Sequence, residues 1–457
     1  MSAGNSVTPR ILERPEHPIS RRDIDGNVLK VLYRLVGAGH TAYIVGGGVR
    51  DLMLGRRPKD FDIATSADPQ EVRDLFRNSR LIGRRFRLVH VFFGQQNIEV
   101  ATFRKRGEDP VGDGDPMIRL DNTFGTPEED AFRRDFTVNA LFYDIRTFRV
   151  IDYVGGVDDL ERRIIRSIGD PDVRMREDPV RMIRAARMSA RFDLTIDPDT
   201  EAAIIRCRDD LAKASTARLA EETFRTLGMN GAARAFNLMH RLGLLPVMLP
   251  YIGDHLDRAE AAENIERNMA AVERELAPGG VADRAIVLAA LFLDHYVNDR
   301  DLRDPATIRD LLTALRGRGF ARADTERMRL ILEAWPHLIE PNRRTFRLAR
   351  RSFFAEARAF YELLASNYGA EPAALTRYLE GPTQRVRQPD SAPSPRRRRR
   401  RNRRRRPAAA STAASPATSM AASPAASMAA SPATSRATST DGVAGSSETR
   451  PDLTHPE

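Results

Sequence analysis

The sequence predicts an α+β amino-terminal domain, then a long all-α region and a carboxy-terminal tail that does not fold. Up to about residue 157, short apolar runs bounded by glycines alternate with helical patterns, which is typical of an α+β domain. From about 158 to 381, apolar residues recur at helical spacing almost throughout. Beyond 382 the composition shifts to Pro, Arg, Ser and Ala, which bury too little apolar surface to offset chain entropy.

The α+β region follows a polar, proline-containing leader, residues 1–19, which we expect to be flexible. Apolar residues at helical spacing then predict a helix that Ser20 opens and Gly37 ends. We predict strands over 42–45, 61–65, 88–93, 97–103 and 140–145, and helices over 49–55 and 68–76. Asp68 is the expected N-cap of the last of these helices, with Pro69 in its first turn.

The all-α region shows its clearest helical periods over 217–229, 260–275 and 284–296. The tail behind it contains an eight-residue near-repeat at 413–420, 421–428 and 429–436, in which the apolar content is almost all Ala. We therefore expect 382–457 to be disordered.

Most of the excess positive charge belongs to the tail. The formal net charge is +10, and ten arginines lie between 396 and 406, interrupted only by Asn402, so +10 − 10 leaves the rest of the chain balanced. A nucleic-acid site in the folded part must therefore come from local clustering of basic residues. We expect the arginine run to be an arm for RNA or for an acidic partner protein.

Other bulk features exclude several classes of protein. Cys207 is the single cysteine, so no intrachain disulfide can form. No apolar run approaches the ~20 residues of a transmembrane helix, and the amino terminus has no signal-peptide core. These features predict a cytoplasmic protein, and they leave its oligomeric state open.

Asp60 and Asp62 form a pair of carboxylates on a predicted strand. Side chains at i and i+2 of a strand point to the same face, so Phe61 points to the other one. Adjacent carboxylates repel each other unless a cation neutralises them, and Mg²⁺ prefers oxygen ligands. An isolated Asp-x-Asp is more often an exposed strand end, so the surrounding sequence has to decide.

A glycine-rich turn precedes this pair. Gly46, Gly47 and Gly48 follow the strand over 42–45 and lead into Arg50 and Asp51. Glycines let phosphate approach the backbone, and an arginine side chain can grip phosphate oxygens bidentately. The turn, the arginine and the carboxylate pair lie within 17 residues, which predicts a metal–nucleotide site. A P-loop is excluded because no G-K-[ST] follows, and a dinucleotide fold because G-x-G-x-x-G is missing.

Three segments together resemble the nucleotidyltransferases of the DNA polymerase beta type. The resemblance is to their class II branch, which contains the tRNA CCA-adding enzymes and the bacterial poly(A) polymerases. The three segments are the glycine turn with its Asp pair, "EEDAFRRDFTVNAL" (128–141) and "GDPDVRMREDPVRMIRAAR" (169–187). The resemblance runs from about Ser20 to about Pro250 and continues weakly to about 380. It implies a nucleotidyltransferase head with a mixed sheet over 20–157, a helical neck that selects the base over 158–215 and an RNA-binding helical body and tail over 216–381.

The resemblance also implies roles for the head residues. Asp60 and Asp62 would hold Mg²⁺ in a two-ion arrangement, and Gly46, Gly47, Arg50 and Asp51 would contact the nucleotide. Asp135 would belong to the catalytic centre and Arg134 would reach the nucleotide, although a carboxylate beside two arginines is also a common salt bridge. Glu99 is an acid on a mostly apolar strand, and it is a candidate third carboxylate.

In the neck, Asp178, Arg181, Arg184 and Arg187 are spaced three apart, which predicts a ridge on one helix. A carboxylate and a guanidinium can offer an acceptor and a donor to a base edge. The resemblance implies that Asp178 and Arg181 select the incoming base without a template, while the other two arginines meet the triphosphate. A solvated basic stripe is the alternative.

The segments 19–47, 77–94 and 119–144 favour the poly(A) enzymes within this branch. Arg84, Arg85 and Arg87 flank an aromatic residue, as expected beside RNA. The resemblance therefore implies transfer of AMP from ATP to the 3′ ends of mRNA, small RNA or tRNA, in RNA processing and decay. CCA addition to tRNA and an inactive RNA-binding scaffold remain alternatives.

Overall fold

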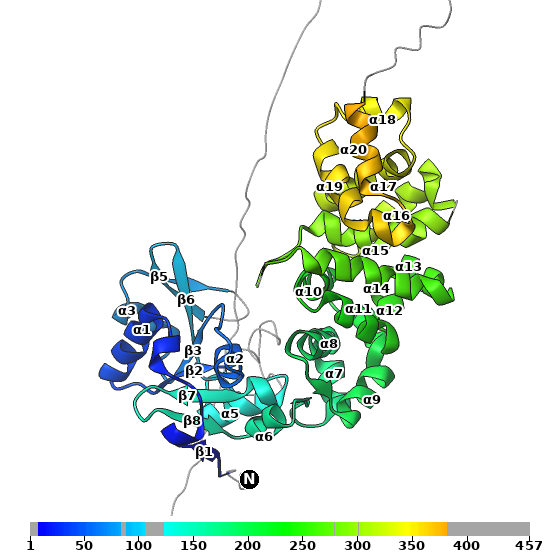
Figure 1. The fold of residues 1–457 in the computed structure, drawn as a ribbon. Helices are drawn as coiled ribbons and strands as arrows, with labels where there is room; N and C mark the ends of the chain where they lie inside the picture. The colour runs from blue at the N-terminus through cyan, green and yellow to red at the C-terminus, as the bar shows by residue number, and fades with distance from the viewer. Residues whose placement is uncertain (1–7, 84–87, 106–122, 278, 300, 382–457) are drawn as a thin grey trace, which may run out of the picture. The chain divides into compact units, whose positions relative to one another are not determined.

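An eight-stranded mixed sheet organises the head (Figure 1). The computed structural model describes residues 8–83, 88–105, 123–277, 279–299 and 301–381. The strand order is β1-β8-β7-β2-β3-β6-β5-β4, in which β3 and β6 are parallel and the other neighbours are antiparallel. The strands are β1 (Arg10–Leu12), β2 (Ala42–Val45), β3 (Asp62–Thr65), β4 (Ser79–Ile82), β5 (Leu88–Phe93), β6 (Gln96–Thr102), β7 (Leu141–Asp144) and β8 (Arg149–Asp152).

The head helices cover both faces of this sheet. The helices are α1 (Gly26–Gly37), α2 (Gly47–Met53), α3 (Pro69–Leu75), α5 (Pro127–Arg133) and α6 (Gly156–Glu161), with 3₁₀ turns η1 (Arg14–Glu16), η2 (Arg21–Asp23) and η3 (Thr137–Asn139). One face packs Ile44 and Ile63 into a core shared with α1 and α3. The other face packs Val45, Ala64 and Phe142 with Ala131 of α5. Strand alternation therefore places Asp62 on the α5 face.

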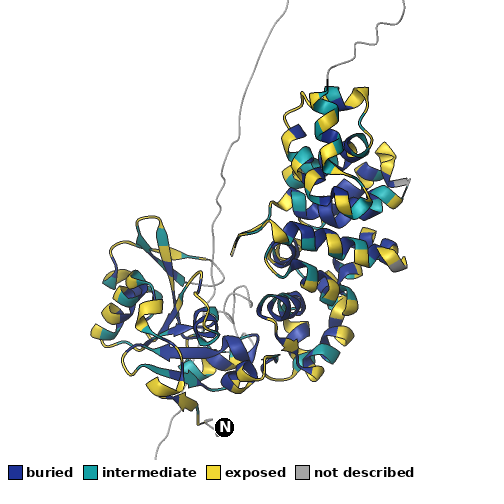
Figure 2. Ribbon diagram, in the orientation of Figure 1, coloured by how far each residue is buried: buried dark blue, intermediate teal, exposed yellow. Residues whose placement is uncertain are grey.

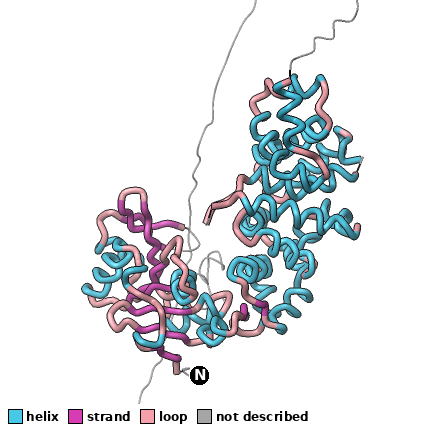
Figure 3. The backbone as a smooth tube through the Cα atoms, viewed as in Figure 1, coloured by secondary structure: helices cyan, strands magenta, loops and turns pink. Residues whose placement is uncertain are grey.

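Residues 158–381 are almost entirely helical, apart from one short parallel strand pair (Figure 3). That pair is β9 (Ile164–Ile165) and β10 (Thr195–Ile196). The first helices are α7 (Pro171–Glu177), α8 (Val180–Phe192), α9 (Pro198–Cys207), η4 (Arg208–Lys213), α10 (Thr216–Leu227), α11 (Ala232–Arg241), α12 (Leu244–Met248) and α13 (Pro250–Leu256). They continue with α14 (Ala259–Arg274), α15 (Arg284–Asn298), η5 (Asp301–Arg303), α16 (Pro305–Gly317), α17 (Arg322–Ile339), α18 (Arg343–Leu348), α19 (Phe354–Leu364), η6 (Ala365–Tyr368) and α20 (Pro372–Glu380).

These helices share a buried core with α15 near its centre. From Val287 to Tyr296, nearly every side chain of α15 is buried, and α15 packs against α14 and α17 (Figure 2). Trp335 of α17 is the largest buried side chain, and it packs edge-on against Phe360 and Tyr361 of α19. The prediction of an α+β head followed by an all-α region is thus confirmed.

Two predictions at the amino terminus are wrong. The expected flexible leader contains β1, which pairs with β8, and its Ile19 is only 1% exposed in the head core. Ser20 caps only the short η2 turn, and the first α-helix begins after its own N-cap, Asp25. The β1 strand was missed because a three-residue edge strand has no pattern of its own and forms only against its partner.

Several predictions concern residues beyond the described ones. The disordered tail over 382–457 and the arginine run within it lie outside them, as do Arg84, Arg85 and Arg87. In the part of the chain that is described, none of the helices combines the length and the apolar character needed to cross a bilayer.

Candidate active site

Three carboxylates gather where β3 begins. Asp62 is the first residue of that strand, Asp60 precedes it in the loop, and Glu99 of β6 is the parallel-sheet neighbour of Asp62. Burial raises the pKa of Asp62, and so do the negative charges of Glu99 and Asp60, while Arg134 acts in the opposite direction. The predicted pair is therefore part of a cluster of like charges at the start of β3, an interior strand of the sheet.

The chemistry of this cluster suits a divalent cation. Carboxylate oxygens are the ligands that Mg²⁺ prefers, and a bound cation would relieve the repulsion that raises the pKa of Asp62. The side chains do not converge fully: within the described ranges, no three His, Cys, Asp or Glu residues adopt a metal-coordinating arrangement. Glu99 is partly turned to His90, with Oε1 3.4 Å from Nε2. The donor types fit the ion, and Asp60 and Asp62 are the residues best placed to hold it.

The glycine turn lies beside Asp62 because strands β2 and β3 are antiparallel neighbours. Val45, at the end of β2, pairs with Asp62, and Gly46 follows with φ 69° and ψ −131°. A Cβ on Gly46 would come within 3.0 Å of Nη1 of Arg134. Glycine is thus needed at this position for its backbone conformation and for the close approach of the arginine.

Arg50 is turned inward, contrary to the prediction that it grips phosphate. It is 8% exposed, and its Nε and Nη2 donate to Oδ1 of Asp51 at 2.9 and 2.6 Å. Its Nη1 donates to Oδ1 of Asn139 at 2.6 Å, and its guanidinium lies 4.0 Å from the ring centroid of Phe192. The physical reason is that Asp51, Asn139 and the aromatic ring together satisfy a guanidinium that leaves water.

Asp135 lies in a buried network that joins the head to the neck. Oδ2 lies 2.7 Å from Nη2 of Arg184 on α8, and Oδ1 accepts from the side chain of Asn139 and from the backbone of Phe136. Burial would raise the pKa of Asp135, but Arg184 and these hydrogen bonds outweigh it and lower the pKa. Asp135 is therefore paired with Arg184 and not with the neighbouring Arg133 and Arg134, which bind Asp130, and the pair fixes Arg184 against the head. The catalytic role of Asp135 stays a prediction.

The predicted ridge from Asp178 to Arg187 does not lie on one helix. Asp178 ends α7 with φ −142° and ψ 92°, and α8 begins after Pro179. The ring of a proline disfavours helical geometry in the residue before it, which explains the break. The backbone N–H of Arg181 still donates to the carbonyl of Asp178 at 3.0 Å, so the two residues remain adjacent.

Each charged residue of this segment has its own partner. Asp178 accepts from Nη2 of Arg218 on α10 at 2.8 Å, and Arg181 donates to Glu177 and to the carbonyl of Arg174. Arg187 lies 3.3 Å from Glu222 on α10. Helix α8 thus pairs Arg184 with the head and Arg187 with α10.

Three residues of this site were not predicted from the sequence. Asn139 contacts Arg50, Asp135 and the sulfur of Met188 at once, and Arg218 holds Asp178. Arg174 is 3% exposed and donates to the carbonyls of Arg133 and Arg134. Arg174 and Asn139 lie inside the motifs that were recognised, but nothing in their spacing shows which distant group each one contacts.

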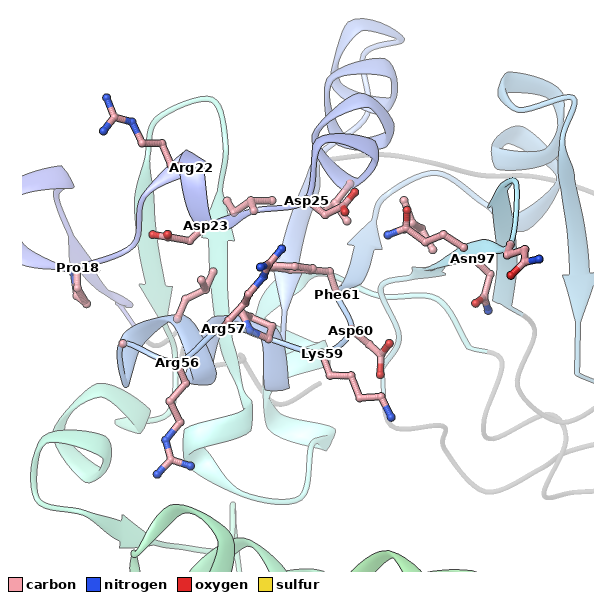
Figure 4. Close-up of a pocket in the computed structure, with 18 residues that line it drawn as sticks. Pro18, Arg22, Asp23, Asp25, Arg56, Arg57, Lys59, Asp60, Phe61 and Asn97 are labelled. Carbon is pink, nitrogen blue, oxygen red and sulfur yellow. The ribbon is translucent and has the colours of Figure 1, made fainter. Parts of the chain in front are cut away.

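A cavity of about 720 Å³ opens beside Asp60 (Figure 4). Its apolar lining includes Ile24, Val28, Leu52, Phe61 and Ile98. Figure 4 shows Lys59 and Asp60 at the same edge. Both basic residues, among them Arg22, Arg57 and Lys59, and acidic ones, Asp23, Asp25 and Asp60, line this cavity.

Comparison with known proteins adds independent support. A family model described as the poly A polymerase head domain matches residues 42–166, and one described as a probable RNA and SrmB-binding site of polymerase A matches residues 193–256. The solved CCA-adding enzyme of Bacillus stearothermophilus in complex with CTP superposes with a TM-score of 0.62 at 30% identity, covering 77% of this chain and 80% of that one. The chain belongs to the family of poly(A) polymerases and CCA-adding enzymes.

Both poly(A) polymerases and CCA-adding enzymes are similar to this chain in sequence. Poly(A) polymerase I of Salmonella typhi is 49% identical over 249 residues, which cover 53% of this chain and 54% of the relative. The CCA-adding enzyme of Lactobacillus helveticus is 40% identical over 201 residues, covering 44% and 49%. The chain thus spans about half the length of the curated relatives it matches.

Proposed function

We propose that this protein is a template-independent nucleotidyltransferase that transfers AMP from ATP to RNA 3′ ends, as a poly(A) polymerase. One observation carries the proposal: Asp62, with Asp60 and Glu99 near it, lies at the same end of the sheet as the Gly46 turn. A nucleoside triphosphate on that turn would lie beside the carboxylates that would orient the reacting 3′ hydroxyl of the RNA. The similarity to poly(A) polymerase I at 49% identity supports the choice of reaction.

The triphosphate would lie between Gly46 and Arg134. Gly46 has no side chain to block the approach, and Arg134 is partly exposed beside it. Arg50 would act indirectly in this arrangement, because its donors already serve Asp51 and Asn139. We therefore assign Arg50 and Asp135 as positioning residues that hold the turn and Arg184 in place.

The reaction forms a bond between the RNA 3′ oxygen and the α-phosphorus and breaks the bond from the α-phosphorus to the bridging oxygen of pyrophosphate. Asp60 and Asp62 would orient the attacking hydroxyl, and Arg134 would face the charge that develops on the leaving pyrophosphate. Divalent cations, when bound by the two Asp residues, polarise the hydroxyl and neutralise phosphate charge.

Asp178 would read the incoming base. One of its oxygens is held by Arg218, while Oδ1 is buried and accepts no hydrogen bond from a described group. A buried acceptor without a donor is costly and would be satisfied by an amino group. Adenine, cytosine and guanine carry such a group on the base edge, whereas uracil does not. The contact therefore disfavours UTP, and the similarity to poly(A) polymerase I favours ATP among the other three nucleotides. The likeness to a CTP-bound CCA-adding enzyme keeps CCA addition as the second candidate.

The helical region offers a surface for the RNA backbone. Five exposed arginines on and just after α18 form no ion pair with a described residue, and we call them the α18 arginine cluster: Arg343, Arg344, Arg347, Arg350 and Arg351. Other arginines of the same region are paired, for example Arg358 with Glu362 and Arg377 with Glu371. Unpaired guanidinium groups favour a polyanion, and single-stranded RNA is the polyanion that this reaction requires.

The experiment is incubation of the full chain with Mg²⁺ and each labelled NTP, on an oligo(A) primer and on a tRNA that lacks its 3′-terminal CCA. Long ladders with ATP alone on the oligo(A) primer support poly(A) polymerase activity. Additions that stop after three nucleotides, need both CTP and ATP and occur only on tRNA would show CCA addition instead. No incorporation on either RNA would refute both and favour an RNA-binding scaffold. A poly(A) activity would place the protein in RNA processing and decay.

A further inference from the structure

Asp130 is a buried carboxylate that contacts both arginines of the Arg133–Arg134–Asp135 segment. It lies on α5 and is 1% exposed. Its Oδ1 accepts from Nε of Arg133 at 2.9 Å, and its Oδ2 accepts from Nε and Nη2 of Arg134 at 3.1 and 2.7 Å. The backbone N–H of Arg104, after the end of β6, donates to Oδ1 at 3.3 Å. Four donors thus converge on one side chain.

The neighbours of Asp130 stabilise its ionised form. Burial alone would raise its pKa, but the guanidinium groups of Arg134 and Arg133 outweigh that effect and lower the pKa. A carboxylate with two cationic partners and a backbone donor stays ionised at neutral pH. The contact to Arg134 is therefore charge-assisted, and because two of its nitrogens donate to the same oxygen, the direction of the guanidinium is fixed as well as its distance.

The other contacts of Arg134 place it against the glycine turn. Its Nη1 donates to the carbonyl of Asn139 at 3.3 Å, and its guanidinium lies 5.4 Å from the ring centroid of Phe142. The same Nη1 is the atom nearest to a Cβ built on Gly46, at 3.0 Å. Its charge is also close enough to oppose the rise in the pKa of Asp62 that burial and Glu99 cause. Arg134 is thus the cation that lies between the turn and the carboxylates.

The backbone of this segment is fixed separately from its side chains. Arg174 of the neck donates from Nη2 to the carbonyls of Arg133 and Arg134. Those bonds hold the chain, but they leave the long side chain of Arg134 free to rotate. Asp130 supplies the missing restraint, because it binds the guanidinium itself.

We propose that Asp130 is a positioning residue that presets Arg134 for the triphosphate of the incoming nucleotide. The inference rests on the proposed function, since it assumes that a nucleotide binds at the Gly46 turn. A flexible arginine loses rotamer freedom when it binds phosphate, and an arginine that is already held does not. Removal of Asp130 therefore weakens nucleotide binding while the reacting groups at Asp60 and Asp62 stay in place.

The test compares the wild-type chain with Asp130→Asn, which keeps the size of the side chain but removes its charge. ATP binding without RNA is measured by calorimetry, and KM for ATP and kcat are measured on an oligo(A) primer. We expect the Kd and KM for ATP to rise by about tenfold, the scale of one charge-assisted contact, with kcat changed much less. A purely structural role would lower the active fraction, so a lower kcat at unchanged Kd and KM would overturn the proposal.

Asp152→Asn is the matched control. Asp152 is also buried in the head, at 2%, but its carboxylate accepts from the backbone N–H groups of Val154, Gly155 and Val157 and forms no ion pair with a described arginine. It should lower Tm and leave the Kd for ATP unchanged. Asp130→Glu keeps the charge and should bind ATP more tightly than Asp130→Asn; equal or weaker binding would count against positioning by charge.

A double-mutant cycle with Arg134→Ala tests whether Asp130 acts through that arginine. If it does, adding Asp130→Asn to Arg134→Ala changes the Kd for ATP no further. Additive losses would overturn the proposal. Wild-type protein that binds no ATP would refute the proposed function itself, whereas equal Kd values for wild type and Asp130→Asn would refute only the role of Asp130.

Discussion

Arg50 donates to the side-chain oxygen of Asn139 at 2.6 Å, and this bond joins two motifs that lie 89 residues apart. Arg50 belongs to the helix that follows the glycine turn, and Asn139 closes the 3₁₀ turn after Asp135. Phe192, the last residue of α8, lies against the other side of the guanidinium. One buried arginine therefore links the turn, the Arg133–Arg134–Asp135 segment and the neck.

Substitution of Arg50 by Ala should reduce stability more than nucleotide affinity. It would leave Asp51 as a buried carboxylate without its cation, which costs on the order of 3–5 kcal/mol. Urea unfolding followed by circular dichroism gives the loss, and ATP calorimetry gives the affinity. Arg73→Ala is the control, since Arg73 on α3 is exposed, lies away from the site and forms no ion pair with a described residue. Unchanged unfolding with a large loss of ATP affinity would show that Arg50 grips phosphate after all.

Arg218→Ala should weaken the discrimination between nucleotides. Arg218 fixes one oxygen of Asp178, so its loss leaves the base-reading carboxylate free to rotate. We expect the ratio of kcat/KM for ATP to that for UTP to fall by about tenfold, within the 1–3 kcal/mol of a base-reading hydrogen-bond pair. Arg225→Ala, which removes an exposed pair with Glu221 on the same helix, should leave the ratio unchanged. If both variants discriminate as the wild type does, Asp178 does not depend on Arg218.

Removal of two arginines from the α18 arginine cluster should weaken RNA binding by a salt-dependent amount. For Arg343→Ala with Arg347→Ala, each lost phosphate contact should reduce the slope of log K against log salt by about 0.7. The control is Arg358→Ala with Arg377→Ala, which removes the same charge from arginines that are already paired. Fluorescence anisotropy with labelled oligo(A), measured over a range of salt concentrations, gives the affinity and the slope for each double variant. Equal losses in the two double variants would mean that only overall charge matters.

Local patterns predicted the head well. The strands over 42–45 and 88–93 appear with the same bounds, and Asp68 caps α3 with Pro69 at its start, because each feature depends on neighbours in the sequence. The break at Pro179 was also readable, since a proline restricts the residue before it. The prediction of a ridge on one helix was wrong because it relied on the three-residue spacing and did not take the proline into account.

Long-range partners could not be predicted in the same way. The sequence placed Arg50, Asp135 and Arg184 in the site, but their roles depend on which charges meet after folding. Asp135 meets Arg184 only because α8 packs against the head, and Arg50 meets Phe192 for the same reason. A guanidinium that lies free at a site and one that is buried in a network have the same sequence pattern.

The carboxylates at the start of β3 are the centre of the account, and their substitution tests it most directly. Asp60→Asn and Asp62→Asn keep the shape of each side chain and remove the negative charge that a cation and the hydroxyl require. The measurement is single-turnover incorporation of labelled ATP into an oligo(A) primer with Mg²⁺, alongside primer affinity by anisotropy. The account predicts loss of incorporation in both variants, by about 10³-fold or more, with primer affinity within about twofold of the wild type. Incorporation at the wild-type rate in either variant would contradict it.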